Sequence, residues 1–204
     1  MLIERLAARL TLAADPAPAP GRRRAAVAVV LREDRVLMMQ RAVRTGDPWS
    51  GHISLPGGGY HPSDRSMLAT AIRETHEELG IELAGARLLG SLAPLHPRIS
   101  GPRRAEDLSE APARPAAAAP VESRDGIEVT PFVFATSVAI EPRCGPEAVA
   151  AFWLPLELAA GGSLDGTYTY PGSGTAFPSW TWEGHVIWGL TLRIIRDLMA
   201  YTTP

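Results

Sequence analysis

The stretch from 57 to 81, GGGYHPSDRSMLATAIRETHEELGI, contains three glutamates at a spacing that brings them together only on a helix. We predict this helix over residues 66–79, where side chains of one face recur at steps of four, three and four residues. The positions of that face are Leu68, Ile72, Thr75 and Leu79. Glu74, Glu77 and Glu78 stand at i, i+3 and i+4, so they occupy one patch of the helix surface.

Three carboxylates held this close repel one another and raise each other's pKa unless a cation joins them. A hard divalent ion with oxygen ligands, Mg²⁺ or Mn²⁺, suits such a set better than zinc. Three consecutive glycines at 57–59 precede the helix, where the backbone can approach a metal ion or a phosphate closely. The alternative is a solvated glutamate-rich helix face that follows an ordinary glycine turn.

The ordered string of glycine, arginine and glutamates resembles the Nudix box, G-x5-E-x7-R-E-U-x-E-E-x-G-U, where U is a bulky apolar residue. Counted from the third glycine, the matching positions are Gly59, Arg73, Glu74, Glu77, Glu78, Gly80 and Ile81. The sequence departs from the box at two positions. Arg65 stands where the first glutamate belongs, with Asp64 beside it, and Thr75 stands at the first apolar position. The cluster that would bind metal is intact.

The composition is that of a soluble globular protein of one domain. The chain has 204 residues, of which 46% are hydrophobic and 21% charged. A formal net charge of −2 gives no reason to expect nucleic-acid or membrane binding, and no apolar run reaches the length of a membrane span. A single cysteine, Cys144, excludes an internal disulfide framework and suits a reducing cytoplasm.

Two segments interrupt the pattern of a folded domain. We interpret residues 1–21 as a short amphipathic helix followed by a Pro-Ala linker, and residues 22–204 as the main domain. Residues 94–126 are rich in Pro, Ala, Arg and Glu without periodicity, which predicts a mobile insertion. A lid over the site and simple disorder both remain open for this insertion.

The rest of the chain alternates strand-like runs with turns and ends in a helix. We predict strands at 25–31, 35–40, 86–92, 127–134, 147–156, 167–170 and 177–182, and a helix at 185–201. Asp34 marks a hairpin turn between the first two strands. Pro131 interrupts the fourth strand and favours an edge or a bend for it. The inner face of the helix is expected at Ile187, Leu190, Ile194, Leu198 and Tyr201.

Within the Nudix superfamily the chain resembles the coenzyme A pyrophosphatase group over most of residues 25–200. The group carries a G-x3-F-P-G-G element, and here Gly51, Leu55, Pro56, Gly57 and Gly58 fill that frame. Four further motifs of the group have counterparts here: the R-[SA] pair at 41–42, the V-T-P-x-V strand at 129–133, the F-W-V-P-L segment at 152–156 and the I-W-G-x-T helix start at 187–191. The group's second upstream arginine is not at its expected spacing, which bears on coenzyme A specificity.

The resemblance implies a Nudix α/β/α sandwich with a mixed central sheet and an enzyme that hydrolyses a nucleoside diphosphate linked to another moiety. It implies Mg²⁺ or Mn²⁺ held by Glu74, Glu77, Glu78 and the carbonyl of Gly58. Arg73 would orient the glutamates. Glu147 matches a downstream glutamate that supplies the base or another metal ligand, with a hairpin-turn residue as the competing interpretation.

Substrate contacts are expected upstream of the box. Arg41 and Arg44 are candidates for binding phosphates, with plain solvation as the alternative, and Gly57 and Gly59 for backbone contacts. The expected partner is a small nucleotide of the coenzyme A-like kind, and dimerisation is common among relatives. ADP-ribose, a dinucleoside polyphosphate or a nucleotide sugar are alternative substrates. A binding module without turnover is a third hypothesis, suggested only by Arg65.

Overall fold

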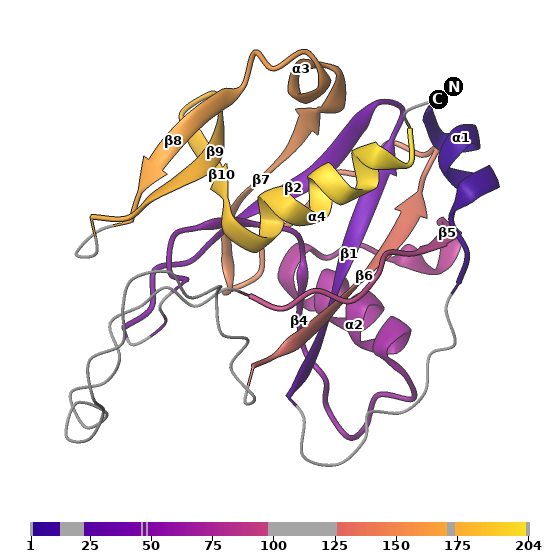
Figure 1. Cartoon of the computed structure of the whole chain (residues 1–204). Helices are drawn as coiled ribbons and strands as arrows, with labels where there is room; N and C mark the ends of the chain where they lie inside the picture. The colour runs from indigo at the N-terminus through magenta and orange to yellow at the C-terminus, as the bar shows by residue number, and fades with distance from the viewer. Residues whose placement is uncertain are drawn as a thin grey trace, which may run out of the picture.

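The computed structural model describes residues 2–12, 23–45, 47, 49–97, 126–170 and 174–202. The elements, in chain order, are α1 (Leu2–Arg9), β1 (Arg24–Arg32), β2 (Arg35–Arg41), β3 (Ile53–Ser54), β4 (Gly57–Gly59), α2 (Met67–Leu79), the short 3₁₀ helix η1 (Leu83–Gly85), β5 (Arg87–Ser91), β6 (Glu128–Ala135), β7 (Ala148–Pro155), α3 (Leu156–Ala160), β8 (Asp165–Thr169), β9 (Ala176–Trp182), β10 (His185–Trp188) and α4 (Gly189–Ala200). Figure 1 shows their arrangement.

A mixed sheet forms the centre of the fold. Its strands run in the order β3-β2-β1-β6-β5, with β4 paired to β1 and β7 paired to β2. The β1–β6 pair is parallel, and the other pairs are antiparallel. Along β1, Ala28 and Val30 pack toward α2, while Val29 and Leu31 pack toward α1 and α4. The α/β class with a mixed sheet between two helical layers is therefore confirmed (Figure 1).

Strand β6 lies in the interior of the central sheet, so of the two alternatives that Pro131 suggested, an edge or a bend, the edge is wrong. It pairs with β1 on one side and β5 on the other. The Pro131 carbonyl accepts a hydrogen bond from the Leu92 N–H at 2.9 Å, one residue beyond the end of β5 at Ser91. Proline is tolerated here because its missing N–H lies beside the loop that follows β5 rather than opposite a residue of the strand.

The predicted C-terminal helix begins four residues later than expected. His185–Trp188 forms β10, which pairs antiparallel with β9 in a separate three-stranded sheet, β10-β9-β8. Glu183 and Gly184 have φ values of +47° and +80°, which are typical of a left-handed turn, and they close this hairpin. The buried side chains of α4 are Leu192, Ile194, Ile195 and Leu198. Tyr201 caps the end of the helix, and its half-buried side chain packs against the same core.

Helix α1 packs into the main core. Leu6 is fully buried with side chains of the sheet and α4, and Arg9 donates a hydrogen bond to the Tyr201 carbonyl at 3.0 Å. The predicted linker and most of the predicted insertion, residues 98–125, lie outside the described residues. Where the insertion would begin, the described chain still pairs with the sheet, because Leu95 bridges Val129.

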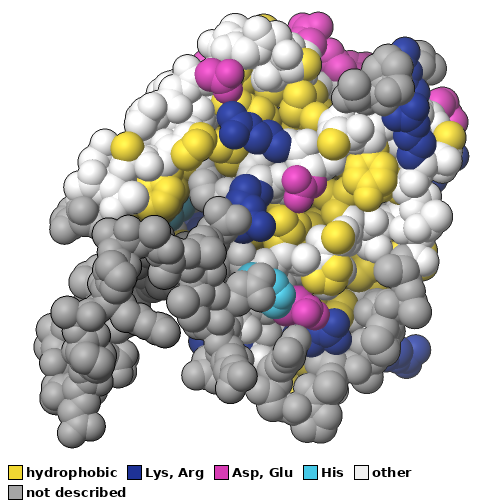
Figure 2. Space-filling view, viewed as in Figure 1, with side chains coloured by type: hydrophobic (Ala, Val, Ile, Leu, Met, Phe, Trp, Pro, Cys, Tyr) yellow, Lys and Arg dark blue, Asp and Glu magenta, His cyan; other side chains and the backbone are white. Residues whose placement is uncertain are grey.

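The surface has no dominant charge on the face that Figure 2 shows. Acidic and basic side chains are scattered there among hydrophobic ones, without a continuous patch of one sign in the described part. No helix within the described residues has the length and apolar character that crossing a bilayer requires. The scattered charges agree with the small net charge of −2.

Candidate active site

Helix α2 presents the glutamates, and its ends are fixed by local capping. The Ser66 side chain accepts a hydrogen bond from the Ala69 N–H at 3.1 Å, and Gly80 adopts the left-handed conformation that ends the helix. The buried side chains are Met67, Thr70, Ala71, Thr75, Glu78 and Leu79. The buried face is therefore rotated from the predicted one, since Leu68 and Ile72 are only half-buried and Glu78 points inward.

Glu78 is a buried carboxylate, with 2% of the residue exposed. One oxygen accepts a hydrogen bond from the Gly57 N–H at 2.8 Å, and the other lies 4.0 Å from the Arg41 guanidinium. Burial raises the pKa of Glu78 to about 7, and the charges of Glu74 and Glu147 add to this effect against the opposing influence of Gly57 and Arg41. A carboxylate in this position is stabilised by any cation that reaches it.

Glu74 lies against the glycine loop. A Cβ atom placed on Gly58 would stand 2.5 Å from the Glu74 carboxylate, so this carboxylate occupies space that any other residue at 58 would force it to leave. Burial raises the pKa of Glu74, an effect that Arg73 opposes and that Glu77 and Glu147 reinforce. The loop and the helix are thus packed so that a backbone segment and a carboxylate face each other without an intervening side chain.

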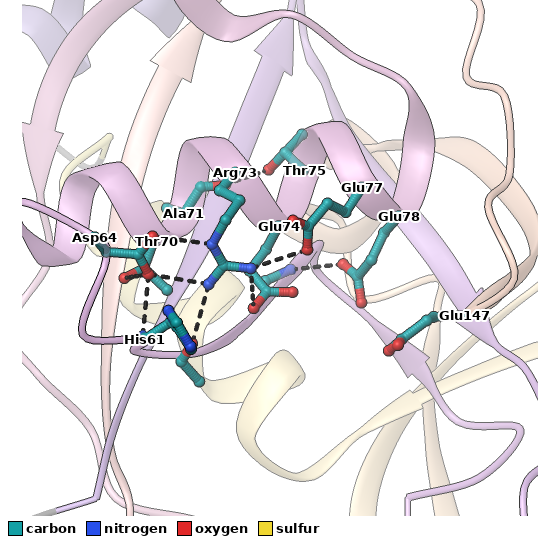
Figure 3. A network of polar contacts seen from close by, with 12 residues as sticks. His61, Asp64, Thr70, Ala71, Arg73, Glu74, Thr75, Glu77, Glu78 and Glu147 are labelled. Atoms are coloured by element: carbon teal, nitrogen blue, oxygen red, sulfur yellow. Dashed lines mark hydrogen bonds and ion pairs between the residues drawn. The ribbon is translucent and has the colours of Figure 1, made fainter.

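Arg73 connects the carboxylates of this region (Figure 3). Its guanidinium lies 2.9 Å from one oxygen of Glu74 and 2.9 Å from one oxygen of Glu77. It also donates to both oxygens of Asp64, at 2.9 and 3.0 Å, and to the Gly59 carbonyl at 3.2 Å. Together, these charge-assisted hydrogen bonds fix the orientation of the arginine and of the glutamates beside it.

Asp64 is the member of this network that sequence reasoning left without a role. It is buried, and besides Arg73 it accepts hydrogen bonds from the Thr70 hydroxyl at 2.8 Å and the His61 N–H at 3.1 Å. The hydrogen bonds from Arg73 contribute most to lowering the pKa of Asp64 to about 2. Arg65, at the position of the missing box glutamate, is exposed. The signal available in the sequence was the acidic residue next to that position.

Arg41, Arg44 and Glu147 meet beside this cluster. Glu147 stands in the turn before β7 and pairs with Arg44 at 3.1 Å. Arg41 ends β2 and pairs with Asp47 at 3.0 Å, a contact that the sequence did not suggest. The Ala42 N–H donates to the Glu147 carbonyl at 2.9 Å, which joins the two segments. In this structure, both arginines therefore contact carboxylates.

The oxygen donors of the α2 glutamates and the Gly58 carbonyl suit a hard divalent cation, although the carboxylate oxygens are held apart from one another. Among the described residues, no three carboxylate, imidazole or thiolate groups converge on one point. The reason is visible in Figure 3, where Arg73 stands between Glu74 and Glu77. Oxygen-only donors, the close approach of Gly58 to Glu74 and the raised pKa values of Glu74 and Glu78 all fit a site for Mg²⁺ or Mn²⁺.

An open pocket of about 430 Å³ adjoins the carboxylates. It is lined by Gly59, Tyr60, His61, Ser63, Arg73, Glu74 and Glu77. A second pocket, of about 400 Å³, lies beside Trp180 and Arg196 and contains no residue of the box. The chemistry of the glutamates therefore assigns the functional role to the first pocket.

A mixed sheet between helical layers, with a glutamate helix beside a glycine loop, defines a protein of the Nudix class. Residues 21–169 match the NUDIX domain, and the chain belongs to this family. It is similar to a protein of Yersinia pestis (strain Pestoides F) named "Uncharacterized Nudix hydrolase NudL", with 31% identity over 182 residues, covering 86% of this chain and 78% of the relative. The same named protein of Yersinia pseudotuberculosis (serotype O:3, strain YPIII) matches equally.

Two solved structures share the fold. The NUDIX domain of Shewanella oneidensis NrtR, complexed with ADP ribose, has a TM-score of 0.54 and 15% identity, covering 93% of this chain and 94% of that one. An Ap4A hydrolase from C. elegans, in a binary complex, has a TM-score of 0.50 and 17% identity, covering 88% and 96%. The family match and the named relatives, rather than these distant structures, show that the chain is a Nudix hydrolase, an enzyme of the pyrophosphatase type. Nudix hydrolases use divalent metal ions, and Nudix proteins bind small nucleotide ligands.

Proposed function

We propose that this enzyme hydrolyses the diphosphate linkage of a nucleoside diphosphate derivative, with a coenzyme A-like molecule as the substrate. The observation that carries the proposal is the gathering of Glu74, Glu77 and Glu78 on α2 beside the glycine loop. Crowded carboxylates with raised pKa values gain most from a divalent cation, and a diphosphate is a substrate that such a cation serves.

Glu74, Glu77, Glu78 and the Gly58 carbonyl would hold Mg²⁺ or Mn²⁺. When bound, the cation would neutralise charge on the diphosphate and lower the pKa of a bound water. Arg73 orients Glu74 and Glu77 through its contacts of 2.9 Å to each. Phosphoryl transfer depends mainly on positioning and charge stabilisation, so this network carries most of the protein's contribution.

The groups that meet the substrate surround the carboxylates. Arg41 and Arg44 bind its phosphates, and the backbone at Gly57 and Gly59 lines the place where the diphosphate lies. Glu147 stands close enough to raise the pKa of both Glu74 and Glu78, and of the two roles that the resemblance implies we assign it that of a further ligand of the cation. It comes from the β7 side of the site, opposite the helix (Figure 3).

The coenzyme A-like substrate is supported by the sequence resemblances at 51–58, 129–133 and 187–191. ADP-ribose is the second candidate, because the NrtR domain with the same fold was crystallised with it. We further propose that the enzyme acts in the cytoplasm, which suits its exposed and unpaired Cys144, and that it forms a homodimer. Size-exclusion chromatography with light scattering tests the dimer.

The test of the function is hydrolysis of a substrate panel with Mg²⁺ by wild type and Glu77→Gln. We expect turnover by the wild type and a loss of at least about a hundredfold in the variant, because one ligand of the cation is removed. Glu82→Gln is the matched control, since Glu82 is 73% exposed and lies beyond the helix. Equal rates in wild type and Glu77→Gln would contradict the proposal, and binding without turnover of any substrate would indicate a sensor.

A further inference from the structure

The two arginines near the glycine loop differ in how firmly they are held. Arg41 contacts both Asp47, at 3.0 Å, and the buried Glu78, at 4.0 Å, and its side chain is 25% exposed. The Arg44 guanidinium instead pairs with Glu147 at 3.1 Å, and these two side chains are 48% and 46% exposed. Such a half-exposed pair is weak and easily exchanged for other partners.

The backbone beneath this weak pair is fixed on both sides. On the Glu147 side, the Gly145 N–H donates to the Glu78 carbonyl at 2.8 Å, and a Cβ atom on Gly145 would collide with the Glu77 carbonyl. On the other side, the Ser50 hydroxyl accepts from the Arg44 N–H at 2.8 Å and donates to the Arg44 carbonyl at 2.7 Å. Exchange of partners therefore requires only side-chain rotation.

Glu147 faces the same negative region as the helix carboxylates. Its charge acts on both Glu74 and Glu78, and Figure 3 shows its carboxylate beside that of Glu78. A divalent cation held by these carboxylates would compete with Arg44 for the Glu147 oxygens. A guanidinium released there is next to the place where the substrate's diphosphate would lie, and phosphate oxygens are its preferred partners.

We propose that Arg44 is a cation-released phosphate ligand: it is held by Glu147 until a divalent ion takes that carboxylate, and it then binds the diphosphate of the substrate. Arg41 remains tied to Asp47 and acts as a fixed part of the site. Cation and nucleotide consequently bind with positive coupling, each favouring the other through one exchanged ion pair. This inference rests on the proposed function, because it requires the diphosphate site.

The test measures binding of α,β-methylene-ADP, which cannot be hydrolysed between its phosphates, by calorimetry in EDTA and in Mg²⁺. Without metal, we expect Glu147→Gln to bind the analogue about two- to fivefold more tightly than wild type, because Arg44 then keeps only its long bond of 3.5 Å to the Pro146 carbonyl. This gain should disappear in the double variant Glu147→Gln/Arg44→Gln. We expect Arg44→Gln to weaken binding about tenfold in Mg²⁺ but less than about twofold in EDTA.

Arg87→Gln is the matched control, because Arg87 forms a similar exposed pair with Glu4 at 3.0 Å. A gain from Glu147→Gln that persists in the Arg44→Gln background would show simple charge repulsion and overturn the exchange. An Arg44→Gln cost that is equal with and without Mg²⁺ would also overturn it, while leaving the proposed hydrolysis intact. Failure of the wild type to bind the analogue even in Mg²⁺ would defeat both proposals.

Discussion

At the scale of single residues, the unusual feature is the displacement of one acidic position. Asp64 stands one residue before the position where the Nudix box has glutamate, yet its two oxygens receive the Arg73 guanidinium at 2.9 and 3.0 Å. Its burial and its bond from the Thr70 hydroxyl make this contact rigid. The arginine that orients the glutamates is therefore supported despite Arg65.

Replacing Asp64 tests whether it supports Arg73 in place of the box glutamate that is missing at position 65. We expect Asp64→Asn to lower the free energy of unfolding by about 2–3 kcal/mol, because it removes charge-assisted bonds to Arg73 in a buried place. We also expect a loss of activity of about tenfold or more, since Arg73 then orients the glutamates less well. Chemical denaturation and initial-rate measurements check the two effects.

Arg65→Ala is the control, because Arg65 is exposed. Its unfolding free energy should stay within about 0.5 kcal/mol of wild type. Arg65→Glu, which restores the box pattern, should bring no gain in rate because Asp64 already holds Arg73. A rate increase in Arg65→Glu, or an Asp64→Asn variant as active as wild type, would show that Asp64 does not have this role.

At the scale of secondary-structure elements, the two faces of the central sheet have separate tasks. The face toward α2 carries the glutamates and the glycine loop, whereas α1 and α4 pack on the opposite face. Helix α1 is short, but Arg5 and Arg9 donate hydrogen bonds to the carbonyls of Thr202 and Tyr201 beyond α4. The first and last helices thus stabilise one another across the sheet from the site.

A core substitution in α1 separates stability from catalysis. We expect Leu6→Ala to cost about 2–5 kcal/mol of unfolding free energy, because Leu6 is 0% exposed and its removal leaves a cavity. The rate per folded molecule should be unchanged, since α1 lies on the face of the sheet away from α2. Thermal denaturation with a rate assay at low temperature checks this, and Leu12→Ala, at a position 51% exposed, is the control. A fall in kcat for folded Leu6→Ala would contradict it.

At the scale of the whole molecule, folding creates a site that is electrostatically unfavourable without a cation. Glu78 is placed in the interior, where burial raises its pKa to about 7 from an ordinary value of 4.5. Between these two pH values the folded protein binds more protons than the unfolded chain. The contribution of Glu78 to stability therefore falls as pH rises through this window, and its full penalty remains above it.

Between pH 4.5 and pH 7, ionisation of Glu78 should lower the free energy of unfolding of the metal-free protein by about 3 kcal/mol. This is the size that the pKa shift of Glu78 implies. We expect Glu78→Gln to remove this part of the pH dependence and to be more stable than wild type at pH 8 in EDTA. Mg²⁺ should raise the stability of wild type at pH 8 more than that of Glu78→Gln, because it neutralises the buried charge.

Denaturant unfolding at a series of pH values, with EDTA or with Mg²⁺, measures these differences. Glu82→Gln, at an exposed position, provides the control for the loss of a carboxylate as such. A Glu78→Gln variant with the same pH dependence as wild type would show that Glu78 is not the group responsible.

The sequence by itself determined the box helix and the grouping of its glutamates, because both follow from the 3.6-residue period and from local capping at Ser66 and Gly80. It also determined the class of fold and most of the strands. Local patterns do not specify partners far along the chain. The residues at 185–188 therefore suggested a helix until pairing with β9 showed a strand, and Pro131 suggested an edge although β1 and β5 lie on both sides of it.

Only the tertiary structure decided which charges meet. Arg44 and Glu147 are 103 positions apart, and Arg73 reaches Asp64 because the loop before α2 folds back on the helix. The burial of Glu78 was likewise invisible to periodicity, since it depends on how α2 is rotated against the sheet. Ion pairing and burial are properties of three-dimensional packing, and for this reason the sequence predicted the reactive groups but not the balance of charge that holds them.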